Sequence, residues 1–234
     1  MIITMQSIRN VARLGLIGSL LIFGISHGAA QAADVGIVNQ FAGDVTYHSG
    51  NAEPTQAQAF MRVRDGDQFS IGAGGLLRLV YFQGGRQETW KGLASFRVGA
   101  ALSEQDSGSK PEVTILPTGV PQKLGRMPEL LQNVRLGGVA LRSVKLPLSI
   151  DKKTEVTEGK TKLSEAKAIY RKLRASATPD DITPELYLFS ILHDYSRYAE
   201  MKSVARNMRK RQPNSIESKV LMAWAEKHAA PSHK

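Results

Sequence analysis

Two acids in a glycine-rich stretch are the first residues of this sequence that could do chemistry. Asp65 and Asp67 flank a glycine, and a second glycine run, GAGG, follows at 72–75. A calcium loop needs a third oxygen ligand where Phe69 stands. A phosphate loop places a lysine after its last glycine and leads into a helix, but apolar and aromatic residues follow here. A catalytic carboxylate pair is the third alternative, but Asp and Gly together favour tight turns. We predict a turn at Asp65-Gly66-Asp67 whose acids face water.

The remaining chemistry-bearing residues do not assemble into a site. No two of the five histidines have a metal-ligand spacing within one expected element. The motif GISHG at 24–28 matches the nucleophile elbow of hydrolases, but it lies in a targeting segment and not on a strand–turn–helix. No nucleophile can be matched with a base. We therefore predict that the chain is not an enzyme and holds no metal and no cofactor.

The first 32 residues have the pattern of a secretory signal peptide. Arg9 and Arg13 precede thirteen uncharged residues at 14–26, and Ala30-Gln31-Ala32 is typical of a cleavage site. An uncleaved anchor is the alternative, but a bilayer needs roughly twenty apolar residues. We expect export to the periplasm with cleavage near Ala32. The chain has no cysteine, so it forms no disulfide and carries no lipid-modified cysteine.

Charge and composition divide the mature chain. The formal net charge of the whole chain is +10, and it falls to +8 without the two arginines of the first 32 residues. Residues 33–103 hold equal numbers of basic and acidic side chains, so residues 104–234 supply all of this remaining excess. The polar runs 103–112 and 151–162 are typical of exposed linkers. The predicted organisation is a signal peptide (1–32), a β-domain (33–103), a linker with a short helix and strand (104–162) and a helical module (163–230).

The first domain is expected to be all-β. About seven short strands separated by turns favour a small sandwich or barrel, and Gly84-Gly85 predicts a two-residue hairpin. The clearest strands are expected at 35–41, 44–48, 59–64, 76–83, 86–90 and 95–99.

This stretch resembles the FecR-like periplasmic domain over about residues 35–100. The matching positions are Gly43-Asp44-Val45, Val63 to Asp67, Ile71 to Gly75, Leu77 to Phe82 and Gly84-Gly85, where the family usually has an acid or Asn before the glycine. The resemblance implies a periplasmic β-module that acts by protein contact. Only about thirteen residues precede the apolar segment, so we do not expect the cytoplasmic anti-sigma segment of the family's namesake.

The rest of the chain is predicted to be mainly helical. The range 126–135 has an apolar stripe that we expect to dock onto the β-domain, VTILP at 113–117 favours a strand, and 137–150 returns to β character. Four helices are expected near 163–176, 183–195, 198–212 and 214–228. Thr183 with Pro184, and Asn214 with Glu217, have the pattern of helix starts.

A repeat of 34 to 35 residues runs through these helices. Ala166 and Met201 lie 35 residues apart, and Pro179 and Pro213 lie 34 apart. This period is similar to that of tetratricopeptide (TPR) repeats, although Phe189 replaces the small residue of that pattern. A plain four-helix bundle is the alternative. The expected fold class is α+β: a FecR-like sandwich or barrel followed by TPR-like hairpins.

One basic cluster, Arg206, Arg209, Lys210 and Arg211, is the candidate contact for an anionic partner. Its alternative role is to complement the dipole at a helix C-terminus. Two functions follow: a non-enzymatic periplasmic adaptor that binds an envelope protein, or an envelope protein that binds glycan or an anionic membrane or polysaccharide surface. Nucleic acid is not an expected partner of an exported chain.

Overall fold

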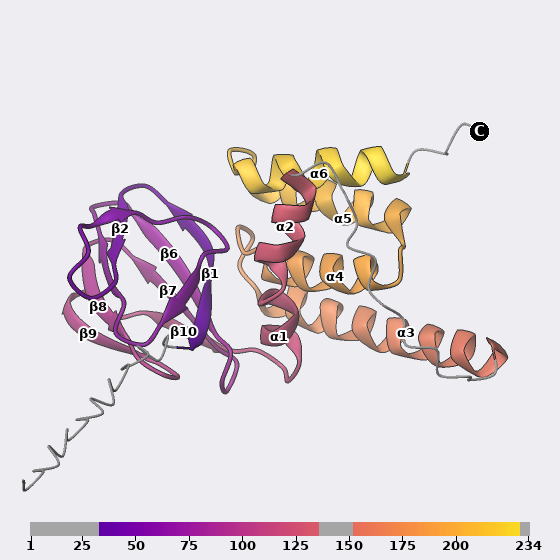
Figure 1. Ribbon diagram of the computed structural model, residues 1–234, viewed down its shortest axis with the longest axis horizontal. Coiled ribbons are helices and arrows are strands. Elements are labelled where there is room, and N and C mark those ends of the chain that lie inside the picture. Colours follow the sequence, from indigo (N-terminus) through magenta and orange to yellow (C-terminus); the bar gives the residue numbers. More distant parts are fainter. Residues whose placement is uncertain (1–32, 136–151, 230–234) are drawn as a thin grey trace, which may run out of the picture. The chain divides into compact units, whose positions relative to one another are not determined.

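The computed structural model describes residues 33–135 and 152–229, which contain ten strands and six helices (Figure 1). The predicted α+β class is confirmed. The predicted signal peptide (1–32) and the expected β segment at 137–150 lie outside the described residues.

Ten strands form two open antiparallel sheets, so the sandwich alternative holds and no barrel closes. The first sheet has the order β10-β7-β6-β1-β4, with β1 (Asp34–Ala42), β4 (Arg62–Arg64), β6 (Leu76–Tyr81), β7 (Arg86–Lys91) and β10 (Glu112–Ile115). The second has the order β3-β2-β5-β8-β9, with β2 (Val45–His48), β3 (Thr55–Gln56), β5 (Gln68–Ile71), β8 (Ala94–Val98) and β9 (Ser103–Gly108).

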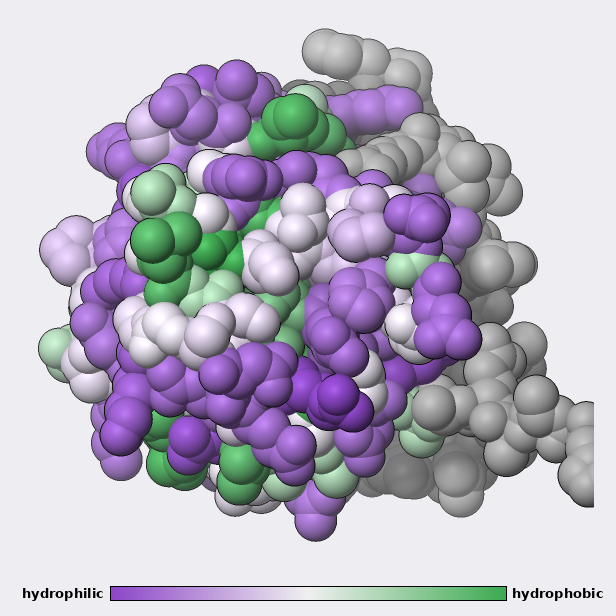
Figure 2. All heavy atoms as spheres, turned by 90° about the vertical axis from the view of Figure 1, so that its left-hand side faces the viewer, coloured by the Kyte–Doolittle hydropathy of each residue, from purple (hydrophilic) through white to green (hydrophobic). Residues whose placement is uncertain are grey.

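Aromatic rings fill the space between the two sheets. Trp90 on β7 stacks on Phe96 of β8 at a centroid distance of 4.2 Å, and Phe96 stacks on Phe69 of β5 at 5.4 Å. All three side chains are buried because alternate residues of each strand face the opposite sheet. The outer face of the second sheet is mostly hydrophilic, with separate hydrophobic groups (Figure 2).

A hairpin joins β6 and β7 at the predicted glycines, but its loop is longer than the two residues predicted. β6 ends at Tyr81 and β7 begins at Arg86, and Gly84 and Gly85 have φ of 71° and 66°, left-handed angles that glycine adopts readily. The expected strand at 59–64 is shorter than predicted and begins at Arg62, because Phe60 also has a positive φ, 63°, and interrupts the extended chain.

The helices are α1 (Val120–Leu124), α2 (Met127–Arg135), α3 (Lys152–Ser176), α4 (Thr183–Asp194), α5 (Tyr198–Arg211) and α6 (Ile216–Ala229). Helices α3 to α6 pack in sequence order, each against the next (Figure 1). The predicted helices at 183–195, 198–212 and 214–228 are confirmed within two residues, whereas the one predicted at 163–176 begins earlier, at Lys152. Their starts differ in detail: the Asp181 carboxylate accepts the Thr183 N–H, and Ser215, not Asn214, accepts the N–H of Ser218.

The predicted linker is largely structured. Residues 103–108 form β9, which pairs with β8, and residues 152–162 belong to α3, so the expectation of an irregular linker was wrong for both. The run at 103–108 is polar because β9 is an exposed edge strand, where an apolar alternation is not needed. The predicted strand and short helix of this region are present as β10 and α2.

The first sheet and the helices share one core within residues 32–234. Ile37 of β1 and Val80 of β6 belong to the same buried cluster as Met127 and Leu130 of α2 and the apolar faces of α3 to α6. The sheet therefore buries both faces, one against the second sheet and one against helices.

Candidate functional site

The Asp65–Asp67 turn is structural and only partly as predicted. Gly66 has φ 91°, as expected for a tight turn, and Asp65 is exposed. Asp67, however, is 4% exposed. Its Oδ2 accepts the Arg64 N–H at 2.8 Å, and its Oδ1 accepts the Ser49 hydroxyl. The expectation that both acids face water was wrong for Asp67, whose carboxylate holds the turn together.

Two histidines lie beside one tryptophan. The ring centroids of His228 and His193 lie 4.2 Å and 5.6 Å from that of Trp224, and burial lowers the pKa of His193. In the described ranges no three His, Cys, Asp or Glu side chains gather as metal ligands would.

The basic cluster at the end of α5 splits into two kinds of side chain. Arg206, Arg209 and Lys210 are exposed. Arg211 instead donates from Nε to Oε1 of the fully buried Glu185 at 3.0 Å and from Nη1 to the Pro179 carbonyl at 2.9 Å. Arg211 therefore pairs its charge with Glu185, although 29% of its side chain stays exposed, and the other three are the exposed cations of the cluster.

A buried polar network joins the first sheet to the start of α4. Arg78 Nη1 lies 3.4 Å from Asp181 Oδ1, and Arg78 Nε donates to Thr89 at 3.1 Å. Gln87 Nε2 donates to Asp181 Oδ2 at 3.0 Å, and the Thr183 hydroxyl donates to Gln87 Oε1 at 2.9 Å. This network is satisfied by its own members, so its role is to position the helices on the sheet.

Beside this network lies a cavity of about 440 Å³ between the end of β1 and the turn that joins α5 to α6. A β-bulge shapes its floor, because the β1–β6 register shifts between Val38 and Gln40 and leaves Asn39 without a partner on β6. Bulges redirect side chains. As a result, Asn39 contacts Thr183 and the next residue, Gln40, contacts Arg78, so both lie on the helix side of the sheet.

Three of the amides that line this cavity use one end within the protein. Asn39 donates from Nδ2 to Thr183, Gln40 accepts from Arg78 through Oε1, and Gln212 donates from Nε2 to the Asp180 carbonyl at 2.8 Å. The structure gives the opposite ends, Asn39 Oδ1, Gln40 Nε2 and Gln212 Oε1, no partner among the described residues. These ends supply two acceptors and one donor, held in fixed orientations.

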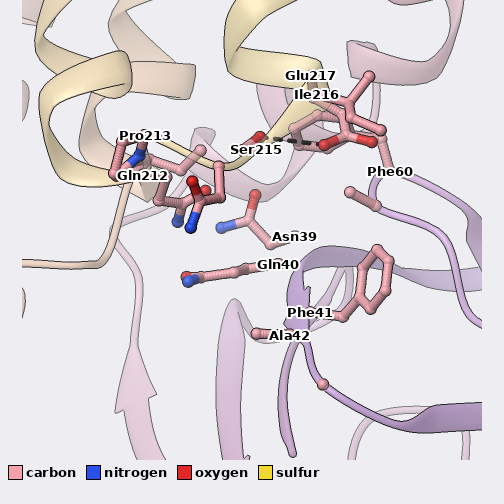
Figure 3. A pocket seen from close by; sticks show the side chains of 14 residues that line it. Asn39, Gln40, Phe41, Ala42, Phe60, Gln212, Pro213, Ser215, Ile216 and Glu217 are labelled. Carbon is pink, nitrogen blue, oxygen red and sulfur yellow. Dashed lines mark hydrogen bonds between the residues drawn. The ribbon is translucent and has the colours of Figure 1, made fainter.

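The opposite side of the cavity is apolar. In Figure 3 the amide groups lie on one side, and Phe41, Phe60 and Ile216 lie on the other. A second cavity of about 670 Å³ shares these three residues and extends along Met61 and Leu131. We call the two cavities together the Phe60 groove.

The sequence contained only a weak signal for this groove. Its walls come from 39–43, 56–61, 128–132 and 212–217, which lie far apart in the chain. The pair Asn39-Gln40 interrupts the apolar run of β1, which is the local mark of the bulge, but the partners of the two amides depend on tertiary packing.

Each helix in 33–135 and 152–229 is too short or too polar to cross a bilayer. The chain matches no protein-family model, no curated protein and no solved structure with which it was compared.

Proposed function

We propose that this chain is an exported, non-enzymatic adaptor of the periplasm that binds a protein partner through the Phe60 groove. The proposal draws on the signal-peptide pattern and on the resemblance of residues 35–100 to FecR-like domains and of 163–228 to TPR repeats. Proteins of both kinds act by contact with other proteins.

The observation that carries the proposal is the exposure of Ile216 at the groove. Its side chain is 65% exposed beside the ring of Phe41 and the buried Phe60. An exposed apolar residue in a concave site, rimmed by polar groups, is typical of a binding surface.

A matched pair of substitutions tests this proposal. Ile115 on β10 is also 65% exposed but lies outside the groove. Immobilised wild type, Ile216→Asp and Ile115→Asp are compared for capture of envelope proteins after cross-linking. We expect Ile216→Asp to lose the bound partner and Ile115→Asp to retain it. An acid in the first turn of α6 is compatible with folding. Capture that survives Ile216→Asp, or that Ile115→Asp abolishes, argues against the groove.

The export of the protein can be tested separately from its binding. N-terminal sequencing of the protein from the envelope fraction is expected to begin near Ala33, after removal of the signal peptide. An intact Met1 or Met5 on that protein would contradict export with cleavage.

The second candidate function is binding of envelope glycan or anionic lipid. The exposed side chains of Arg206, Arg209 and Lys210 at the end of α5 favour it. We expect the wild type to bind phosphatidylglycerol vesicles in low salt, and binding to fall steeply as salt screens the charges. Arg206→Ala, Arg209→Ala and Lys210→Ala together should abolish it. Equal binding by this triple variant would exclude the cluster as the anionic contact.

A further inference from the structure

One edge of β1 is left unpaired where it passes the Phe60 groove. The ladder to β4 runs from Asp34 to Ile37, and Val38 then bonds to the neighbouring loop, donating to the Met61 carbonyl at 2.9 Å and accepting from Phe60 N–H at 2.6 Å. From Gln40 to Ala42, β1 pairs with β6 on its other edge, but no described strand covers the edge toward the groove.

Phe60 is the reason that the pairing stops. Its φ of 63° is a left-handed conformation that is rare for a bulky aromatic residue. The chain turns there, so the residues before Phe60 leave β1 and run toward β3, where Ala57 N–H donates to the Val45 carbonyl at 2.8 Å. Such conformations are uncommon and concentrate at functional sites.

The groups around this free edge can pair with the backbone and side chains of an extended peptide. The open ends of Asn39, Gln40 and Gln212 offer acceptors and a donor of the kind that peptide groups pair with. Phe41 and Ile216 provide apolar contacts for side chains on alternate positions.

The charge of the groove limits its occupant. The chain has a net charge of +10, but the lining of both cavities contains no Lys or Arg, and Glu217 is its single charged residue. An acidic side chain would meet no cation there and would face Glu217, so a neutral or basic segment is favoured.

Resting on the proposed function, we infer that the Phe60 groove takes an extended, acid-free segment of the protein partner, which adds as a strand to β1 at Gln40–Ala42. Main-chain hydrogen bonds would provide affinity, and the apolar contacts would select the side chains, as in other cases of strand addition.

The test uses the full mature chain and a labelled, acetylated peptide of sequence Thr-Val-Thr-Val-Lys-Val-Thr. We expect saturable binding. Alternate residues of an antiparallel strand direct their N–H groups to opposite edges, so within 40–42 the exchange of an amide hydrogen that faces the free edge should slow by about tenfold at saturation. The same peptide N-methylated at its valines should bind at least about tenfold more weakly, since it loses donors. Replacing its lysine with glutamate should have a similar effect.

A substitution in the groove itself complements the changes made to the peptide. Gln40→Glu keeps an oxygen for Arg78, whose cation pairs with the new carboxylate, so the network persists and the change at the groove is the loss of the Nε2 donor. We expect about tenfold weaker binding of the peptide. Gln122→Glu, on the exposed face of α1, serves as the control and should bind like the wild type.

Each alternative outcome overturns the inference. Failure of the peptide to bind, equal binding of the N-methylated peptide, or protection only outside 40–42 excludes strand addition. Binding of chitotetraose in place of the peptide assigns the groove to a saccharide. If Ile216→Asp still loses its captured partner in these cases, the adaptor proposal stands and only the strand mode fails.

Discussion

The guanidinium of Arg78 on β6 and the carboxylate of Asp181 before α4 form an ion pair from which water is almost excluded. The two atoms Nη1 and Oδ1 lie 3.4 Å apart, and only 2% and 5% of the two side chains are exposed. Both groups have further partners, which offsets the cost of taking charges out of water. The pair fixes the helices on the first sheet and thereby sets the wall of the Phe60 groove.

Removing Arg78 is expected to be severely destabilising. Arg78→Ala leaves Asp181 buried without its cation, which should lower the free energy of unfolding by about 3–5 kcal/mol. Arg97→Ala is the control, because Arg97 is an exposed arginine on β8, and its loss should cost within about 0.5 kcal/mol. Urea denaturation of the two variants and the wild type measures the difference. Equal stability of both variants would mean that the ion pair does not hold the sheet and helices together.

Much of the fold could be predicted because it depends on local patterns. The apolar periodicity and the prolines predicted α4, α5 and α6 nearly to the residue, and Gly84-Gly85 predicted the β6–β7 hairpin. β9 was missed because an exposed edge strand of polar residues has no alternation to detect.

The candidate site could not be predicted in the same way. The burial of Asp67 depends on Ser49, and the orientation of Gln40 depends on Arg78 across the bulge. Arg211 was expected with the anionic-contact cluster, but its carboxylate partner Glu185 lies on another helix. These are long-range pairings, and residue type alone does not reveal them.

The two acids of the Asp65–Asp67 turn are expected to contribute differently to the stability of the fold. Asp67→Asn replaces one acceptor with a donor that faces either the Arg64 N–H or the Ser49 hydroxyl, so it should cost about 1–3 kcal/mol. Asp65→Asn, on the exposed side of the same turn, is the control and should be nearly neutral. Thermal melting with and without calcium measures both effects. Stabilisation of the wild type by calcium, lost in Asp67→Asn, would indicate a metal site instead.

Gly66 tests the backbone of the same turn. At φ 91° a branched residue is strained, although the space around the glycine is open. Gly66→Val should therefore lower the free energy of unfolding by about 1–3 kcal/mol. Ala52→Val, at an exposed site, is the control, because Gly50 also has a positive φ and would be strained in the same way. If Ala52→Val lowers the free energy of unfolding as much as Gly66→Val does, backbone strain is ruled out as the cause.

Replacing Arg211 with alanine should destabilise the protein, whereas the same change at Arg209 should not. Arg211→Ala removes a charge-assisted bond to the fully buried Glu185, which retains Arg174 at 3.0 Å, so a loss of about 1–3 kcal/mol is expected. Arg209→Ala removes an exposed side chain and should leave the urea midpoint unchanged. If the two variants have the same midpoint, Arg211 belongs with the solvent-exposed cations after all.

Acidification is expected to weaken the packing around Trp224. Burial lowers the pKa of His193, an effect to which Arg126 and His228 add and which Asp194 opposes. A group whose pKa is lower in the folded state contributes stability above its unfolded pKa, about 6.5 for histidine, and that stability is lost as the pH falls toward the folded value. The melting temperature should therefore drop between pH 7.5 and pH 5.5. His193→Gln cannot take up the proton and should show a smaller drop, whereas His48→Gln on β2, away from Trp224, controls for the loss of a histidine. The same drop in His193→Gln as in the wild type would place the pH sensitivity elsewhere in the chain.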